Sequence, residues 1–492
     1  MPDLSEYRGR FGDFHAELEE DAWLCRSGGR SASERAHITS EYSDLFTTGA
    51  MSDLETARSE IAEWLETERR AVDRLRVFAI FGFVGLRASG IETEIERYFR
   101  ASGIEHRGQG VPLNRLDRCI AAEKIAADRR ELAGKRSDLR AGASDLYGER
   151  LEIWKRSLVE AGRTNGFTGI RRELLGDDQI SLADRAERLL SGTERGYIAE
   201  LSAILPAETG VSIDDATDAD LDHLDFNSGY DAWFSPERMA PLCHEIFDGF
   251  GFRVAGQKNL RLTQDSGPGA ACFPVRVPGD IRLSVEISGT QKGWRSFFAA
   301  AGRAQSYAWT SGNLPIEFRR VVRWGDSALS NCWADLIAGI ISEDHWLQGS
   351  LGLIENAKLR RMLRLVRLIR IRRAAAGHLF DLETLESGSD PFRTYAERMG
   401  DALKVRCDSA AALMDVSPGF SHGNTLRGAA LEAQLRDHLK TRFGERWWTS
   451  RKAGEMIIDL WNTGQRYSAE ELAGIIGLGD LDFDWLAADL VR

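Results

Sequence analysis

Apolar residues recur every three or four positions along most of the chain, which is the spacing of one buried face of an α-helix. Residues 53–85 and 116–162 show this pattern most strongly, with charged residues at most of the remaining positions. The helical pattern returns after residue 290. Only eleven prolines occur among 492 residues, so few of these helices are interrupted. The pattern predicts a mainly α-helical protein.

One segment departs from the helical pattern. Residues 267–288, "GPGAACFPVRVPGDIRLSVEIS", alternate apolar and polar positions between glycines and prolines. This alternation predicts two or three short strands, and we expect one small β-sheet at about residues 255–288. It is the only β region that the pattern indicates. A helix is expected directly after it, over residues 294–309.

An acidic, turn-rich stretch at residues 206–235 predicts a surface connection between two lobes. We therefore expect an N-terminal helical lobe over residues 1–205 and a second lobe over residues 206–492. Six aspartates of the connection could together attract calcium: Asp214, Asp215, Asp218, Asp220, Asp222 and Asp225. Their spacing matches no EF-hand loop, so the stretch is interpreted as a solvated acidic loop.

Charge and composition exclude some classes of partner. The formal net charge is −12, which disfavours a general nucleic-acid binder because phosphate binding needs a basic surface. No apolar run approaches the roughly 20 residues of a membrane span, and the first residues lack a signal-peptide pattern. Six scattered cysteines form no C-x-x-C pair. We expect reduced thiols, a cytoplasmic location, and neither nucleic acid nor membrane as a partner.

The helix expected at residues 294–309 has an unusual polar face. Its apolar stripe includes Trp294, Phe297 and Phe298, whereas the opposite face carries alanines and a single charged residue, Arg303. Three consecutive alanines and a glycine precede that arginine. The sequence therefore suggests a face from which functional side chains have been removed.

The surrounding segments resemble the oligoendopeptidase F / thimet oligopeptidase family of zinc peptidases. Residues 272–283 are similar to the family's strand segment "CFPVRVP…VRL", and residues 314–332 follow its "LPFEYR…GDNSVTEG" with departures. Residues 417–448 and 460–472 resemble its C-terminal helices. The resemblance implies a two-lobed, metallopeptidase-like helical fold of the gluzincin type, with a deep cleft beside the small sheet.

In that family a helix carries H-E-x-x-H, whose two histidines and a later glutamate bind zinc while the first glutamate serves as base. The resemblance places these four roles on Ala299, Ala300, Arg303 and Asn331. Alanine has no lone pair to donate, and arginine has no acceptor. The family's two substrate-binding tyrosines fall on the shorter hydroxyl residues Ser421 and Thr425. We therefore expect no metal, no cofactor and no zinc-dependent peptide hydrolysis, while other enzymatic activity stays open.

Two further features of the sequence bear on metal binding and ligand binding. The spacing H-E-x-x-D at His244, Glu245 and Asp248 could hold a metal, but these residues lie opposite an apolar stripe and predict a solvated helix face. Arg303 needs a partner if it is buried. Either Glu317 or Asp326 forms a salt bridge with it, or it binds the carboxylate or phosphate of a ligand.

We expect a pseudopeptidase that binds a peptide or small anionic ligand in the former active-site cleft, in part through main-chain bonds to a sheet edge. The alternatives are a repurposed metal-independent enzyme, for instance of specialised metabolism, and a structural protein that binds a protein partner. The basic segment 358–373 would serve that last role. The sequence contains no signal for an oligomeric state. The candidate cleft residues are Gly269, Ala270, Ala271, Cys272, Arg303, Asn331, Ser421, His422 and Thr425.

Overall fold

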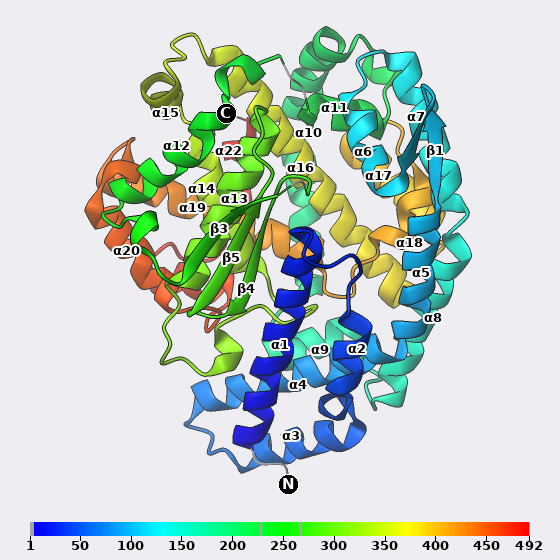
Figure 1. Cartoon of the computed structure of the whole chain (residues 1–492), viewed down its shortest axis with the longest axis vertical. Coiled ribbons are helices and arrows are strands. Elements are labelled where there is room, and N and C mark those ends of the chain that lie inside the picture. The colour runs from blue at the N-terminus through cyan, green and yellow to red at the C-terminus, as the bar shows by residue number, and fades with distance from the viewer. Residues whose placement is uncertain (1–3, 227–228, 266, 492) are drawn as a thin grey trace. The chain divides into compact units, whose positions relative to one another are not determined.

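The structure is a computed structural model that describes residues 4–226, 229–265 and 267–491, and most of these are helical (Figure 1). The prediction of a mainly α-helical protein is confirmed. The chain folds into two compact units, and each is assembled from three separate segments. From the sequence we expected two lobes that each consist of one continuous stretch of chain, residues 1–205 and residues 206–492. We call the two units the sheet unit and the hairpin unit.

The sheet unit comprises Met1–Ala79, Ser228–Arg361 and Arg427–Leu486. Its helices are α1 (Leu4–Arg26), α2 (Arg35–Glu41), α3 (Thr48–Glu60), α12 (Pro236–Gly249), α13 (Gln291–Ala308), α14 (Ala328–Gly339), α15 (Asp344–Trp346), α20 (Arg451–Asn462) and α21 (Ala469–Ile475). Its strands are β3 (Leu260–Gln264), β4 (Ala270–Arg276) and β5 (Asp280–Val285).

The hairpin unit comprises Ile80–Asn227, Met362–Leu426 and Ala487–Arg492. Its elements are α5 (Ser89–Ala101), β1 (Gly103–His106), β2 (Gln109–Pro112), α6 (Leu113–Ala122), α7 (Ala126–Ala141), α8 (Ser144–Glu160), α9 (Gly166–Leu175), α10 (Gln179–Thr209), α11 (Asp218–Phe226), α17 (Pro391–Leu403) and α18 (Ala412–Asp415). Four of the five boundaries between the units fall within α4 (Glu66–Arg87), α16 (Ala357–Leu382), α19 (Ser421–Phe443) and α22 (Phe483–Val491), and the fifth falls between residues 227 and 228.

The sheet of the first unit lies where the alternation predicts it. Its strand order is β3-β5-β4, with β3 parallel and β4 antiparallel to β5, so β4 is an edge strand. Ala271, Phe273 and Val275 of β4 pack against α1, which covers one face of this strand. Because side chains alternate along a strand, the residues between them face the other way, where α13 packs against β4 and β5 (Figure 1).

α13 confirms the helix predicted after the sheet. It begins where the Thr290 side chain accepts a hydrogen bond from the Gly293 amide, an N-cap. Trp294 and Phe298 are fully buried on its apolar side, where each large side chain contributes roughly 2–3 kcal/mol through burial. On the side facing α14, a Cβ at Gly302 would lie 2.5 Å from the Trp333 carbonyl oxygen. Glycine at 302 therefore permits the close approach of α13 and α14.

The hairpin unit contains β strands that the sequence pattern did not indicate. β1 and β2 pair antiparallel around Arg107 and Gly108, whose φ angles are 51° and 75°. Both strands have only four residues, and none of their residues is fully buried, so they lack the apolar alternation that signals a strand. A positive φ at both turn positions suits the tight turn of a hairpin. The prediction of a single β region was therefore wrong.

The acidic stretch is likewise more ordered than expected. Its residues 218–226 form α11, and Asp220 is buried, with its carboxylate 2.6 Å from Arg129. The Asp222 carboxylate lies 3.2 Å from Arg373. The interpretation as a solvated loop was wrong for these residues, because basic residues from other parts of the chain neutralise the acids. Residues 227–228 of the stretch lie outside the described residues.

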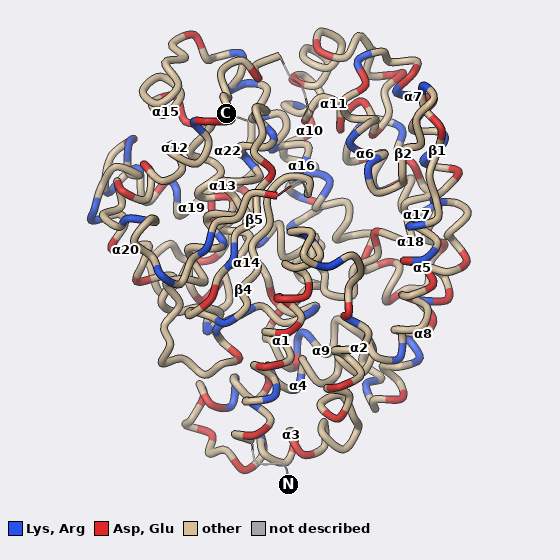
Figure 2. Tube along the Cα trace, viewed as in Figure 1, with Lys and Arg blue, Asp and Glu red and all other residues tan. Residues whose placement is uncertain are grey.

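Basic and acidic positions are interspersed along the chain (Figure 2). The basic segment 358–373 belongs to α16, and several of its arginines have partners within their own unit. Arg372 donates to the carbonyl oxygens of Ala402 and Leu190, and Arg367 pairs with Asp489 at 2.7 Å. These contacts leave less of the segment available to an anionic partner. No helix in the described part of the chain is both long and apolar enough to cross a membrane.

Candidate functional site

The four positions that the resemblance assigns to the zinc site lie on α13 and α14. Ala300 is buried, whereas Ala299, Arg303 and Asn331 are partly exposed. Nη2 of Arg303 donates a hydrogen bond to Oδ1 of Asn331 across 3.3 Å. Within residues 4–226, 229–265 and 267–491, no group of three or more His, Cys, Asp or Glu side chains is arranged to hold a metal ion.

The predicted ionic partners of Arg303 are engaged elsewhere. Oε1 of Glu317, which is fully buried, lies 2.6 Å from Nε of Arg8. Oδ1 of Asp326 lies 3.0 Å from Nη1 of Arg427. The expectation that Glu317 or Asp326 pairs with Arg303 was therefore wrong. Among the described residues the Arg303 guanidinium has a neutral amide as its hydrogen-bond partner and no carboxylate.

The main chain of β4 has one side bonded to β5 and one side open. The Glu286 amide donates to the Gly269 carbonyl at 2.8 Å, and the strand register then makes Ala271 and Phe273 bond to β5. The amides and carbonyls of Ala270 and Cys272 consequently point away from the sheet. Two independent contacts agree with this assignment. The Ala270 amide donates to Oγ of Ser296 at 3.0 Å, and Arg320 donates to the Pro274 carbonyl.

Of the four small residues predicted to admit a ligand, two present main-chain groups to this open edge and two do not. Gly269 is fixed structurally: its φ is 67°, its carbonyl accepts from Arg26 at 2.9 Å, and a Cβ there would lie 2.8 Å from Oγ of Ser296. Ala271 bonds to β5 and packs toward α1. Ala270 and Cys272 remain as the residues of the open edge.

Charged and titratable side chains lie near the open edge; the sequence had suggested Cys272 and Arg303 but not Glu19, Tyr307 or Arg320. Burial raises the pKa of the Cys272 thiol; Glu19 raises it further and Arg303 lowers it. Burial also raises the pKa of Tyr307 to about 12. Burial raises the pKa of Glu19 to about 7, against the opposing effect of Arg320. Because these groups influence one another's pKa values, they lie close enough to interact electrostatically: Cys272, Glu19, Arg303, Tyr307 and Arg320. A ligand at the edge would be exposed to the same charges.

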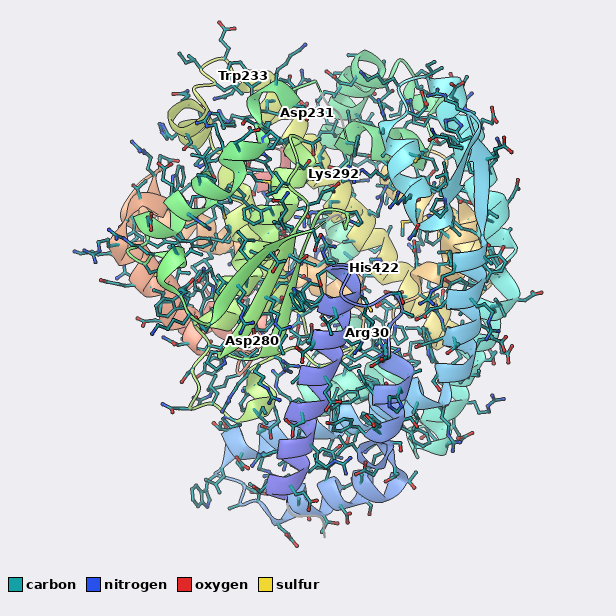
Figure 3. The ribbon with its side chains drawn as sticks, in the orientation of Figure 1. Arg30, Asp231, Trp233, Asp280, Lys292 and His422 are labelled. Carbon is teal, nitrogen blue, oxygen red and sulfur yellow. The ribbon has the colours of Figure 1, made fainter. Side chains whose placement is uncertain are left out.

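The remaining predicted site residues form a second group, in the hairpin unit. His422, labelled in Figure 3, belongs to the first turn of α19, and its Nδ1 lies 2.9 Å from Oδ2 of Asp381. Asp381 is fully buried and also accepts from the Ser417 amide at 2.8 Å. The carboxylate therefore holds the proton on Nδ1 and leaves Nε2, on a side chain 24% exposed, as the free nitrogen. The sequence had suggested His422 but had not identified its acidic partner.

The pKa of His422 reflects two opposing effects. Burial lowers it, but the charge and hydrogen bond of Asp381 outweigh burial, so the net shift is upward. A Cβ at Gly377 would lie 2.6 Å from the His422 ring, so glycine at 377 leaves room for the imidazole. This arrangement orients the ring as a proton donor or acceptor toward its exposed side.

Ser421 and Thr425 do not form a polar cluster with His422. Oγ1 of Thr425 donates to the Ser421 carbonyl within α19 at 2.9 Å, a bond along its own helix. Ser421 is exposed, and its amide donates to Oγ of Ser417 at 3.1 Å. The structure thus pairs Arg303 with Asn331 and places Arg303 near Cys272 in the sheet unit, and it pairs His422 with Asp381 in the hairpin unit.

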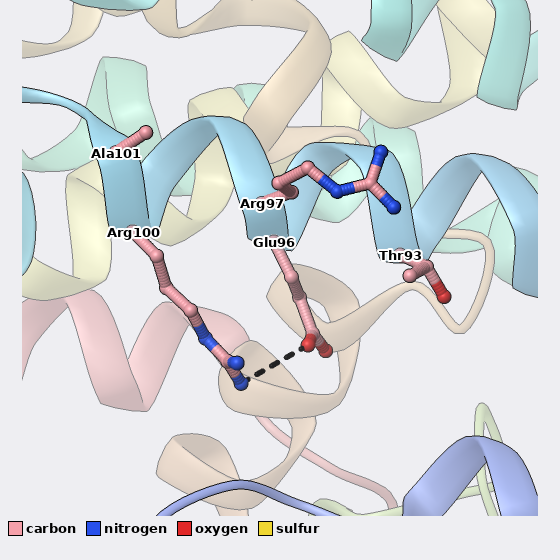
Figure 4. Close-up of a pocket in the computed structure, with 5 residues that line it drawn as sticks. All are labelled: Thr93, Glu96, Arg97, Arg100 and Ala101. Carbon is pink, nitrogen blue, oxygen red and sulfur yellow. Dashed lines mark ion pairs between the residues drawn. The ribbon is translucent and has the colours of Figure 1, made fainter.

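Two other places offer no comparable chemistry. Glu245 and Asp248 of α12 are exposed and His244 is partly exposed, opposite the buried apolar stripe, which confirms the predicted solvated helix face. An open depression on α5 is lined by five residues of that one helix, and two of them, Glu96 and Arg100, pair with each other at 3.5 Å (Figure 4).

Comparison with known proteins does not assign the chain to a family. No protein-family model matches it, and no curated protein matches its sequence.

Proposed function

We propose that this chain is a degenerate relative of the oligoendopeptidase F / thimet oligopeptidase family, without zinc and without zinc-dependent hydrolysis, that binds a peptide or small anionic ligand. The binding site of the proposal is the open edge of β4 beside Arg303. The proposal includes the two-lobed arrangement and deep cleft that the resemblance implies. It also places the protein in the cytoplasm, in keeping with six cysteines that form no disulfide among the described residues.

The main-chain groups of Cys272 carry the proposal. Its amide and carbonyl point away from β5, and no described residue bonds to either of them. Unpaired main-chain groups at a sheet edge are the groups through which an extended ligand adds to a sheet. Such bonds form without a metal ion, so loss of the zinc ligands leaves this mode of recognition intact.

Arg303 supplies the charge selectivity. Its guanidinium is partly exposed and holds a single hydrogen bond of 3.3 Å to a neutral amide, so most of its donors remain for a ligand. Arginine binds carboxylate and phosphate oxygens with two parallel hydrogen bonds. A ligand that carries an anionic group near its main-chain contacts with Cys272 would therefore bind better than its neutral analogue.

The test compares N-acetylated peptides that end in a free carboxylate with the same peptides ending in an amide, by isothermal titration calorimetry. We expect the carboxylates to bind about tenfold or more tightly, and Arg303→Gln to remove that preference. Arg261→Gln serves as the matched control, because Arg261 lies on β3 at the opposite edge of the same sheet with its side chain 67% exposed. Equal binding of acids and amides would contradict the role of Arg303, and absence of any peptide binding would contradict the proposal itself.

The pair of His422 and Asp381 favours a second candidate, a metal-independent enzyme. A buried carboxylate that orients an imidazole is a common arrangement for general acid–base catalysis. The test incubates the protein with a cytosolic metabolite extract in the presence of a chelator and follows the consumed and produced masses. The second candidate predicts turnover that His422→Gln abolishes and the chelator leaves unchanged. Identical mass profiles with and without the protein would contradict it.

A structural role in binding a protein partner would involve neither site. The acidic partners of Arg367 and Arg373 within the hairpin unit give that role less support than the two candidates above.

A further inference from the structure

The open edge of β4 is short, and its length limits the ligand. We infer that the site accepts ligands of dipeptide to tripeptide size with an anionic end, and that it excludes longer extended peptides from edge pairing. This inference rests on the proposed function and narrows its ligand class. It depends on what occupies each end of the open edge.

At one end, Ser296 of α13 occupies the edge. Its Oγ accepts the hydrogen bond of the Ala270 amide at 3.0 Å, so this donor is already satisfied. Before it, Arg26 donates to the carbonyls of Gly267 and Gly269 at 3.1 and 2.9 Å, which fixes the entry to β4. An incoming strand therefore meets no free donor before the Cys272 amide.

At the other end, Pro274 and Arg320 close the edge. Proline has no amide hydrogen, so position 274 cannot donate to a ligand. Its carbonyl accepts from Nη2 of Arg320, a side chain 5% exposed that also reaches the Val275 carbonyl at 3.4 Å. Beyond Cys272 the edge therefore offers neither a donor nor an acceptor.

Three main-chain groups remain: the Ala270 carbonyl, the Cys272 amide and the Cys272 carbonyl. No described residue donates to these carbonyls or accepts from this amide outside the sheet. A strand rises about 3.4 Å per residue, so the three groups span roughly 7 Å, the length of two to three residues of an extended ligand. A longer peptide would have to run past Ser296 or Arg320 without main-chain partners.

The anionic end follows from the position of Arg303 along α13. Seven residues separate Ser296 from Arg303, which is roughly 10 Å along a helix. A similar distance along β4, about three residues, leads from Ala270 to Phe273. Ser296 contacts Ala270, and Nδ2 of Asn259 donates to the carbonyls of both Ala308 and Pro278, so α13 runs in the direction of β4. Arg303 therefore comes level with Cys272 and Phe273, beside the closed end of the edge. A carboxylate that terminates a short ligand there would meet the guanidinium, whereas a continuing peptide chain would meet Arg320.

The experiment measures ligand length directly. The full chain is equilibrated with a Pronase digest of casein that contains peptides of two to twelve residues, and the peptides retained on ultrafiltration are identified by mass spectrometry. We expect retention concentrated at two and three residues, at least tenfold over peptides of six or more. Equal retention of octapeptides would overturn the length limit while the proposed function survives. Retention of no peptide would overturn both.

A variant at Ser296 tests the cause of the limit. Ser296→Ala frees the Ala270 amide at a helix position that is partly exposed, and it should shift the retained peptides toward one additional residue. Ser342→Ala is the matched control: its hydroxyl donates to the Gly339 carbonyl, away from the sheet. An unchanged length distribution in Ser296→Ala, with dipeptides still retained, would overturn the assignment of Ser296 as the end of the edge.

Discussion

Arg303 on α13 donates a hydrogen bond to Asn331 on α14 across 3.3 Å. The family resemblance assigns both positions to zinc ligands, and in this structure the two side chains contact each other directly. Neither carries a negative charge. The arginine is therefore held in place without being neutralised, and this pairing is central to the ligand preference that we propose.

The stability of the protein should depend little on Arg303. We expect Arg303→Gln to lower the unfolding free energy by less than about 1 kcal/mol, because it loses one long hydrogen bond from a partly exposed side chain. Urea denaturation at pH 7 measures this change.

Arg8→Met provides the contrast. The substitution leaves the fully buried Glu317 carboxylate without its cationic partner and should lower the unfolding free energy by about 3 kcal/mol or more. A loss of that size in Arg303→Gln would instead mean that Arg303 belongs to a buried charge network.

Gly302→Ala should be destabilising despite the higher helix propensity of alanine. The new Cβ would lie 2.5 Å from the Trp333 carbonyl and 3.0 Å from Cγ1 of Ile337, so the backbones of α13 and α14 must separate. We expect a loss of about 1–3 kcal/mol, measured by chemical denaturation.

Gly134→Ala on α7 is the matched control for the same substitution. Gly134 is exposed, and no atom would lie within 4 Å of its new Cβ. There the helix propensity of alanine acts alone and should stabilise the protein by roughly 0.5–1 kcal/mol. Stabilisation by both substitutions would show that α13 and α14 are not in close contact at Gly302.

His422 should titrate above its ordinary pKa of 6.5, because the Asp381 carboxylate favours the protonated ring. A group whose pKa is higher in the folded state stabilises the fold fully below the unfolded pKa and loses that contribution as pH rises through the folded pKa. Unfolding free energy should therefore fall from pH 6.5 upward by this contribution, and His422→Gln should remove it. NMR titration of the imidazole measures the pKa. Asp381→Asn should lower it, because the charge and hydrogen bond that favour the protonated ring are removed, and an unshifted value would show that the pair does not form.

Glu19 should give a pH dependence that Glu19→Gln removes. Its pKa is raised to about 7, chiefly by burial, so between pH 4.5 and 7 the folded state holds a proton that the unfolded state has released. The unfolding free energy should fall as pH rises through this range. At pH 8 Glu19→Gln should be more stable than the unmodified protein by roughly 2–3 kcal/mol, and near pH 4 the two should agree. Parallel stability curves across this range would show that Glu19 is solvated.

The sequence by itself determined the local elements. Helical periodicity predicted α13 and the helical remainder, because the spacing of apolar residues reflects which face of a helix is buried. The alternation of apolar and polar residues between glycines and prolines predicted β4 and β5. The same rules missed β1 and β2, since four-residue strands without a buried face show no alternation. Residue identities alone also show that positions 299, 300 and 303 are alanine, alanine and arginine, which have no lone pair to donate to a metal ion.

The tertiary structure decided which charges meet. Glu317 pairs with Arg8 from more than 300 positions earlier, and the partners of Asp220 and His422 are likewise distant along the chain. Chain spacing contains no information on such contacts, because they depend on how helices pack rather than on the period within any one helix. The open edge of β4 has the same origin. Strand order and register determine which amides face outward, and side chains from α13 and from the segment after Phe318 close its two ends.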